Sequence, residues 1–131
     1  MVVVKTDSLV GRVLALVVGR PGPLQDSLAA LLATIPVVDM VVMSDDISAI
    51  LDSLSDWNPD LILLDSALFD PGVSDVLCRA RELRPHARWI LLADNVQQQQ
   101  DAAVGGADVA LLKGSPAAEL VLAIETLLPS V

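Results

Sequence analysis

The 131-residue sequence predicts an α/β fold: a doubly wound, parallel five-stranded sheet with helices on both faces. Two observations support this prediction. Short apolar runs rich in β-branched residues alternate along the chain with stretches whose apolar residues recur at helical spacing. The runs are also apolar throughout, so they must be buried on both faces, and a parallel sheet with right-handed crossover helices provides that burial.

The composition is that of one folded domain. Hydrophobic residues make up 53% of the chain and charged residues 19%, which argues against disorder. We assign residues 11–131 to this domain and residues 1–10 to an N-terminal extension. The net charge of −9 disfavours nucleic-acid and membrane-surface partners, because both bind clustered basic residues. The sequence shows no membrane-spanning run and no export signal, so we expect a cytoplasmic protein.

The first half of the chain predicts two strands and two helices. Turn-forming glycines and prolines follow the first strand, and Pro36 ends the first helix. Residues 44–46 have the chemistry of a helix N-cap. The predicted strands are Arg12–Val18 and Val38–Met43, and the predicted helices cover 24–35 and 47–54.

The second half predicts three strands and three helices. The tract Gln97–Gln100 has the composition of a flexible, solvated loop. Ser115 is the predicted N-cap of the last helix, with Pro116 at its first position. The predicted strands are Leu61–Leu64, Trp89–Leu92 and Val109–Leu112; the predicted helices cover 76–83, a short stretch before Gly105-Gly106, and 116–128.

Two charged residues stand where the predicted sheet would hold a functional site, which is at the carboxyl ends of its strands. Asp65 ends the most apolar strand, where a partly desolvated carboxylate could act as a nucleophile or a metal ligand. Lys113 follows the last strand and could reach the same edge as an ion-pair or phosphate partner. A loop-capping aspartate and an exposed lysine are the alternatives.

Two segments resemble the receiver domain of bacterial two-component response regulators. They are PDLILLD at 59–65 and GGADVALLKGSPAAEL at 105–120, and the similarity extends over Arg12–Leu128. The chain is similar above all to receivers of regulators that carry a C-terminal helix-turn-helix. The resemblance implies a flavodoxin-like (βα)5 fold without enzymatic activity, a phosphoacceptor at Asp65 and a phosphate partner at Lys113. It also implies a histidine kinase or an output domain as partner.

The chain departs from the receiver pattern at three other places. The family has a pair of acids after the first strand, where this sequence has Val18 and Gly19. It has a Ser or Thr where Ala93 stands and an aromatic residue where Ala110 stands. Mg²⁺ requires carboxylate oxygens, so we expect no cofactor and weak or absent Mg²⁺-dependent phosphorylation. The leading interpretation is a pseudo-receiver that serves phosphorelay signal transduction through protein contacts.

Other residues could replace the missing groups. Arg20 lies next to the vacated acid position, where it could pair with Asp65 and substitute for a bound cation, or be a solvated loop residue. Asp94, Asp45 and Asp46 could also approach the site, but we interpret them as cap and loop acids.

Two further functions remain open from the sequence. The chain could be a conventional receiver phosphorylated on Asp65 with Mg²⁺. It could also be a flavodoxin-like domain that binds a small molecule in a widened, uncharged mouth near Val18, Ala93 and Ala110. An independent enzyme is not supported, because one His and one Cys cannot supply a catalytic triad. The apolar helix surfaces are compatible with a homodimer.

Overall fold

The computed structural model describes most of the predicted elements. It covers residues 2–4, 13–45, 59–66, 78–79, 81–83 and 86–128. The predicted helix over 47–54 and most of the predicted helix over 76–83 lie outside these residues.

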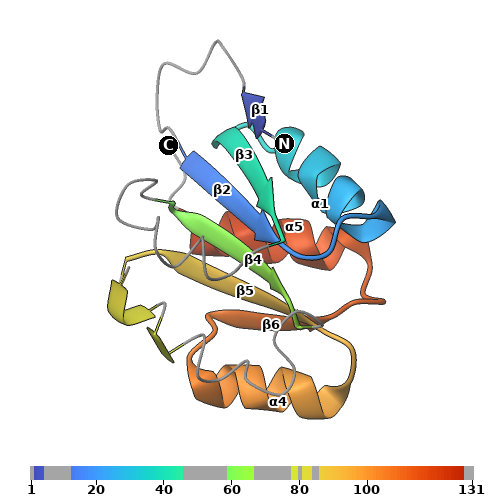
Figure 1. Cartoon of the computed structure of the whole chain (residues 1–131), viewed down its shortest axis with the longest axis vertical. Helices are drawn as coiled ribbons and strands as arrows, with labels where there is room; N and C mark the ends of the chain where they lie inside the picture. The colour runs from blue at the N-terminus through green and yellow to red at the C-terminus, as the bar shows by residue number, and fades with distance from the viewer. Residues whose placement is uncertain are drawn as a thin grey trace.

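A single sheet forms the centre of the molecule (Figure 1). Its strand order is β1-β3-β2-β4-β5-β6, and β2 to β6 run parallel to one another. The five predicted strands and their parallel arrangement are therefore confirmed. The strands are β1 (Val2–Val4), β2 (Val13–Val18), β3 (Val38–Ser44), β4 (Leu61–Asp65), β5 (Arg88–Ala93) and β6 (Val109–Leu112).

The sixth strand, β1, was not predicted. Its three valines lie in the N-terminal extension and pair antiparallel with β3, with Val3 opposite Val41. Three residues are too few to show a strand periodicity in the sequence. An antiparallel edge strand on a parallel sheet is common in doubly wound folds.

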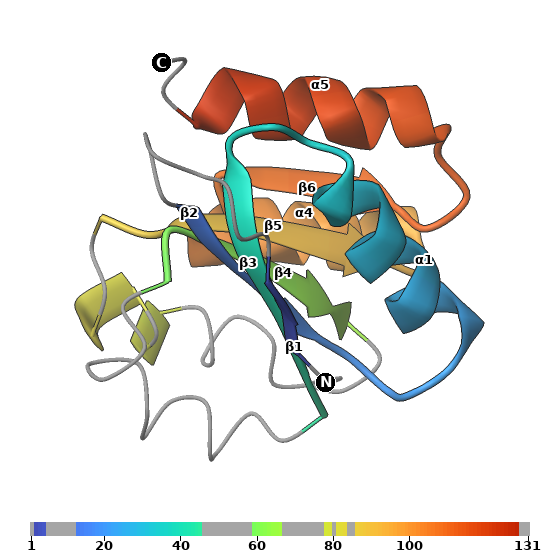
Figure 2. The ribbon, with the colours of Figure 1, turned by 90° about the horizontal axis from the view of Figure 1, so that it is seen from above.

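The described helices lie on both faces of the sheet. The helices α1 (Pro23–Ala33) and α5 (Ala117–Leu127) share one face, and α4 (Val96–Gly105) contributes to the other (Figure 2). Successive residues of a strand point to opposite faces, so Leu63 belongs to the core under α1 and α5, and Leu64 to the core that includes Ala102 of α4. Within the described chain, no helix combines the length and apolarity needed to cross a bilayer.

Two local predictions about the helices are wrong. Gln97–Gln100 belong to the first half of α4 and not to a loop. Asn95 is the N-cap of this helix, and its side chain accepts a hydrogen bond from the Gln98 N–H at 2.9 Å. In α5 the capping position is taken by Pro116, and no side chain caps the helix, so Ser115 lies one residue further out than predicted.

Candidate functional site

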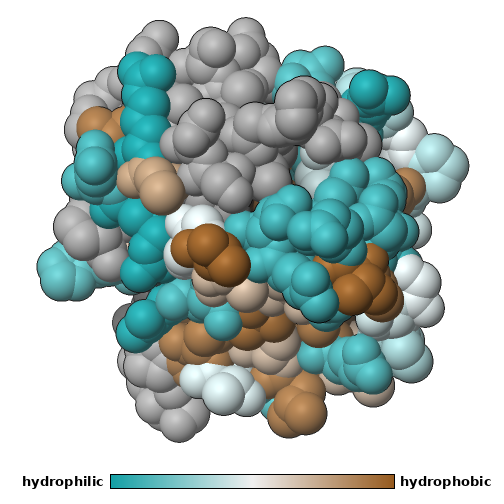
Figure 3. All heavy atoms as spheres, turned by 90° about the horizontal axis from the view of Figure 1, so that it is seen from below, coloured by the Kyte–Doolittle hydropathy of each residue, from teal (hydrophilic) through white to brown (hydrophobic). Residues whose placement is uncertain are grey.

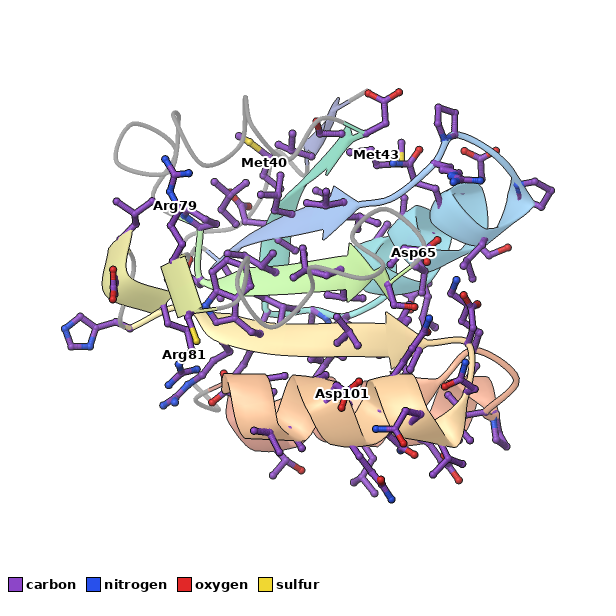
Figure 4. All side chains as sticks on the ribbon, turned by 60° about the horizontal axis from the view of Figure 1, so that its bottom comes forward. Met40, Met43, Asp65, Arg79, Arg81 and Asp101 are labelled. Carbon is purple, nitrogen blue, oxygen red and sulfur yellow. The ribbon has the colours of Figure 1, made fainter. Side chains whose placement is uncertain are left out.

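The carboxyl ends of β4, β5 and β6 bring three charged side chains together. Asp65 is the last residue of β4, as Figure 4 shows, while Asp94 directly follows β5 and Lys113 directly follows β6. The three strands are consecutive neighbours in the sheet and run in the same direction. The Lys113 N–H donates to the Ala93 carbonyl at 2.9 Å, which fixes the lysine backbone beside the end of β5.

Lys113 forms ion pairs with both carboxylates. Its Nζ lies 2.5 Å from Asp65 Oδ1 and 2.6 Å from Asp94 Oδ1. The Asp65 side chain is 12% exposed and that of Asp94 is 46% exposed, so the ammonium bridges an inner and an outer carboxylate. Asp65 and Lys113 therefore meet at the edge of the sheet where the sequence placed them.

The pKa of Lys113 is raised above its usual value of 10.5. Burial lowers the pKa of the ammonium, but the hydrogen bonds and negative charges of Asp65 and Asp94 outweigh that effect. Lys113 therefore carries its full positive charge at neutral pH.

Asp94 is the residue whose role the sequence analysis underestimated. We interpreted it as a cap or loop acid, whereas the cap of α4 is Asn95 and the Asp94 carboxylate pairs with Lys113. Asp94 directly follows β5, and Lys113 directly follows β6, the neighbour of β5 in the sheet. This pair of positions indicates the contact.

Arg20 does not lie against Asp65. Its side chain is exposed, and the ion pairs found among the described residues do not include it. The cation beside Asp65 is the Lys113 ammonium instead. Asp45 is also exposed and takes no part in these ion pairs, and Asp46 lies outside the described residues.

The residues that depart from the receiver pattern are buried or partly buried. Val18 and Ala93 are fully buried. Gly19 is also buried, and a Cβ built on it would lie 3.2 Å from the Asp65 Cβ, so the backbone here presses close to the carboxylate. Ala110 is partly buried in β6. Val18 and Ala93 therefore offer no exposed surface to a ligand, and the small-molecule alternative stays a prediction.

The described residues line two grooves near the site. One, of about 550 Å³, lies between α1 and α5 and is lined mostly by apolar side chains such as Leu31 and Leu120. The other, of about 560 Å³, lies beside Asp94 and Lys113. Val18, Ala93 and Ala110 line neither of them.

Gln25 of α1 fixes the ends of β2 and β3. It is buried, and its Nε2 donates to the Gly19 carbonyl at 3.1 Å and to the Ser44 carbonyl at 3.2 Å. The Gly19 N–H also donates to the Ser44 carbonyl, at 2.9 Å. This side chain therefore holds the loop that brings Gly19 against Asp65.

Replacing Gln25 with leucine should lower the free energy of unfolding by about 1–2 kcal/mol, because a buried carbonyl then loses its donor. Denaturant titration followed by circular dichroism measures the change. The matched control is Gln100→Leu, at an exposed position of α4, which should change the stability by less than about 0.5 kcal/mol. Equal losses for both variants would contradict the assigned role of Gln25.

The comparisons with known proteins agree on one fold. No protein-family model and no curated protein matches the chain. Among solved structures, the signal receiver domain of the putative response regulator NarL from Mycobacterium tuberculosis has a TM-score of 0.72 at 26% identity, over 86% of this chain and 93% of that one. A LuxR-family two-component response regulator from Aurantimonas sp. SI85-9A1 has a TM-score of 0.75 at 23% identity, over 86% and 82%.

A third solved structure has the same fold. The CheY-like protein TadZ from Pseudomonas aeruginosa has a TM-score of 0.66 at 21% identity, over 89% of this chain and 97% of that one. In this chain a carboxylate and a lysine are in contact at the ends of parallel strands. This chain has the receiver-domain fold of two-component response regulators, and its structural neighbours are response-regulator receivers.

Proposed function

We propose that the chain is a pseudo-receiver: a signalling module that works through protein contacts and takes up a phosphoryl group weakly or not at all. The observation that carries this proposal is the lack of an acid at Gly19 and of a hydroxyl at Ala93, two residues at the strand ends around Asp65. The Lys113 ammonium supplies the positive charge at this carboxylate site.

The residues described around Asp65 do not fit a Mg²⁺ site. Mg²⁺ needs near-octahedral oxygen ligands, and phosphoryl transfer relies on it to neutralise developing charge. Gly19 contributes no side-chain oxygen, and Ala93 contributes no hydroxyl for a phosphoryl group. The described residues also include no group of three or more His, Cys, Asp or Glu side chains arranged to hold a metal.

Exposed apolar side chains support a role in protein contacts. Val104 and Val96 on α4 are 90% and 54% exposed, and Leu122 on α5 is 65% exposed. Figure 3 shows hydrophobic surface gathered next to a strongly hydrophilic region. Val96 and Val104 lie on α4 and Leu122 on α5, so apolar side chains are exposed on both faces of the molecule. We propose a signalling protein, a histidine kinase or an output domain, as the partner.

One observation favours a conventional receiver as the second candidate. Asp65 and Lys113 are in direct contact, and the receiver resemblance pairs these two residues around a phosphoryl group. In this alternative, Asp65 would be phosphorylated despite the absence of the acid pair.

Phosphorylation from a small-molecule donor tests the two candidates. After incubation with acetyl phosphate and Mg²⁺, intact-mass spectrometry should show no species heavier by about 80 Da, the mass of one phosphoryl group. A receiver known to be labelled by the same donor, treated in parallel, shows that the reagent is active. Labelling of the native chain that disappears in Asp65→Asn would refute the pseudo-receiver proposal and establish the conventional one.

A further inference from the structure

The helix α4 is attached to the sheet by unusually little apolar packing. Of its ten residues, Ala102 and Gly105 are the buried ones, and its largest apolar side chains, Val96 and Val104, point into solvent. In contrast, α5 buries Leu120 and Ile124. Because helices in proteins are stabilised mainly by packing of an apolar face, α4 depends on other contacts.

Two glutamines supply these contacts. The Gln98 Oε1 accepts hydrogen bonds from the Ser66 hydroxyl at 2.7 Å and from the Asp94 N–H at 2.8 Å. The Gln99 Nε2 donates to the Ala110 carbonyl of β6 at 2.9 Å. The side chains of Gln98 and Gln99 therefore attach the first half of α4 to Ser66, to Asp94 and to strand β6.

The contacts of Gln98 close a ring that includes the carboxylate site. Asp65 pairs with Lys113, Lys113 with Asp94, the Asp94 backbone with Gln98, and Gln98 with Ser66, the covalent neighbour of Asp65. We call these five residues the polar ring. Ser66 is buried at the end of β4, so the ring joins the ends of β4, β5 and β6 to the first turn of α4.

We propose that the polar ring is a latch that couples the carboxylate site to α4. A group that draws Lys113 away from Asp94 would free the loop at Asp94, which in turn weakens the Gln98 anchor and loosens the first turn of the helix. Asp94 and Gln98 are positioning residues in this scheme.

Ala93 and Ala110, on the same strands, have no polar side-chain group and take no part in the polar ring. Its signalling use rests on the proposed function, whereas the physical coupling can be tested by itself.

Hydrogen exchange of the intact chain tests the latch. In the native protein, we expect the amides of α4 to exchange faster than those of α5. Asp94→Ala and Lys113→Met should each speed exchange in the first turn of α4 by about tenfold, the equivalent of losing one charge-assisted hydrogen bond. Exchange in α1 should change no more than the measured loss of global stability of each variant predicts. Gln98→Ala should accelerate the same turn and serves as a second route to the result if one charge variant folds poorly.

The matched control lies on the same helix. Gln97 bonds Asp101 at 3.0 Å on the exposed side of α4, outside the ring, so Gln97→Ala should leave first-turn exchange within about twofold of native. Unchanged exchange in α4 for Asp94→Ala and Lys113→Met, or an acceleration that is the same in every helix and equals the loss of global stability, would overturn the latch. Labelling of Asp65 by a phosphodonor would refute the proposed function without altering either exchange result, so the two failures are distinguishable.

Discussion

Replacing Leu63 with alanine should lower the free energy of unfolding by about 3–4 kcal/mol, the largest loss we expect from a single side chain. Leu63 is fully buried on β4, which lies between β2 and β5 in the interior of the sheet. The substitution removes apolar contacts and leaves a cavity that neighbouring strands, held by their ladders, cannot easily fill. Urea unfolding monitored by tryptophan fluorescence and by circular dichroism measures the loss.

The same substitution on the surface is the control for Leu63. Leu122 of α5 is 65% exposed, and Leu122→Ala should change the stability by less than about 0.5 kcal/mol. A loss below about 1 kcal/mol for Leu63→Ala would contradict the position of β4 within the sheet.

Replacing Lys113 with methionine should lower the free energy of unfolding by about 2 kcal/mol at neutral pH. The variant leaves the Asp65 and Asp94 carboxylates facing each other without the ammonium that bridges them. Loss of one partner from a buried pair costs about 3–5 kcal/mol and from an exposed pair below about 1 kcal/mol. Because Asp65 is nearly buried and Asp94 half exposed, we expect an intermediate value.

The stabilisation by Lys113 should disappear at high pH. The pKa of this group is raised in the folded protein, so the unfolded chain loses its proton first as the pH rises. The stabilisation that the Lys113 ion pairs contribute is therefore fully present below about pH 10.5. It is lost as the pH rises through the pKa of Lys113 in the folded protein. The chain contains one other lysine and no tyrosine, so few groups obscure this titration.

Unfolding titrations between neutral pH and about pH 11.5 measure this effect. The native chain and Lys113→Met should differ at neutral pH, and the difference should begin to shrink above about pH 10.5. Arg20→Met is the control, since it removes one positive charge from an exposed residue outside the ion pairs and should behave like the native chain. A constant difference between the native chain and Lys113→Met across the pH range would show that methionine perturbs the packing instead.

The sequence predicted the sheet well because its strands are buried on both faces. Runs such as Leu61–Leu64 have no polar face, and a short run of this kind between helical patterns fits a central parallel strand. Val2–Val4 escaped prediction because pairing at the sheet edge with β3, and not its own pattern, makes it a strand.

The site was only half predictable. Asp65 and Lys113 follow the apolar runs of two predicted strands, so their positions could be read from the sequence. In the structure they form an ion pair. The contacts of Asp94 and Gln98 depend on the order of the strands in the sheet and on the path of the loop after β5. Local composition does not contain this information, and it predicted a capping acid at Asp94 and a solvated loop at Gln98. In the fold, the Gln98 side-chain oxygen satisfies donors from two separate loops.

The close approach of Gly19 to Asp65 limits which side chain the loop after β2 can carry. A Cβ at Gly19 would lie 3.2 Å from the Asp65 Cβ, tight enough that the neighbouring chain must shift to admit it. Buried Gln25 donates to the Gly19 carbonyl and so holds the same loop. An acid introduced at Gly19 would therefore crowd the carboxylate beside it unless the loop that Gln25 holds moves as well.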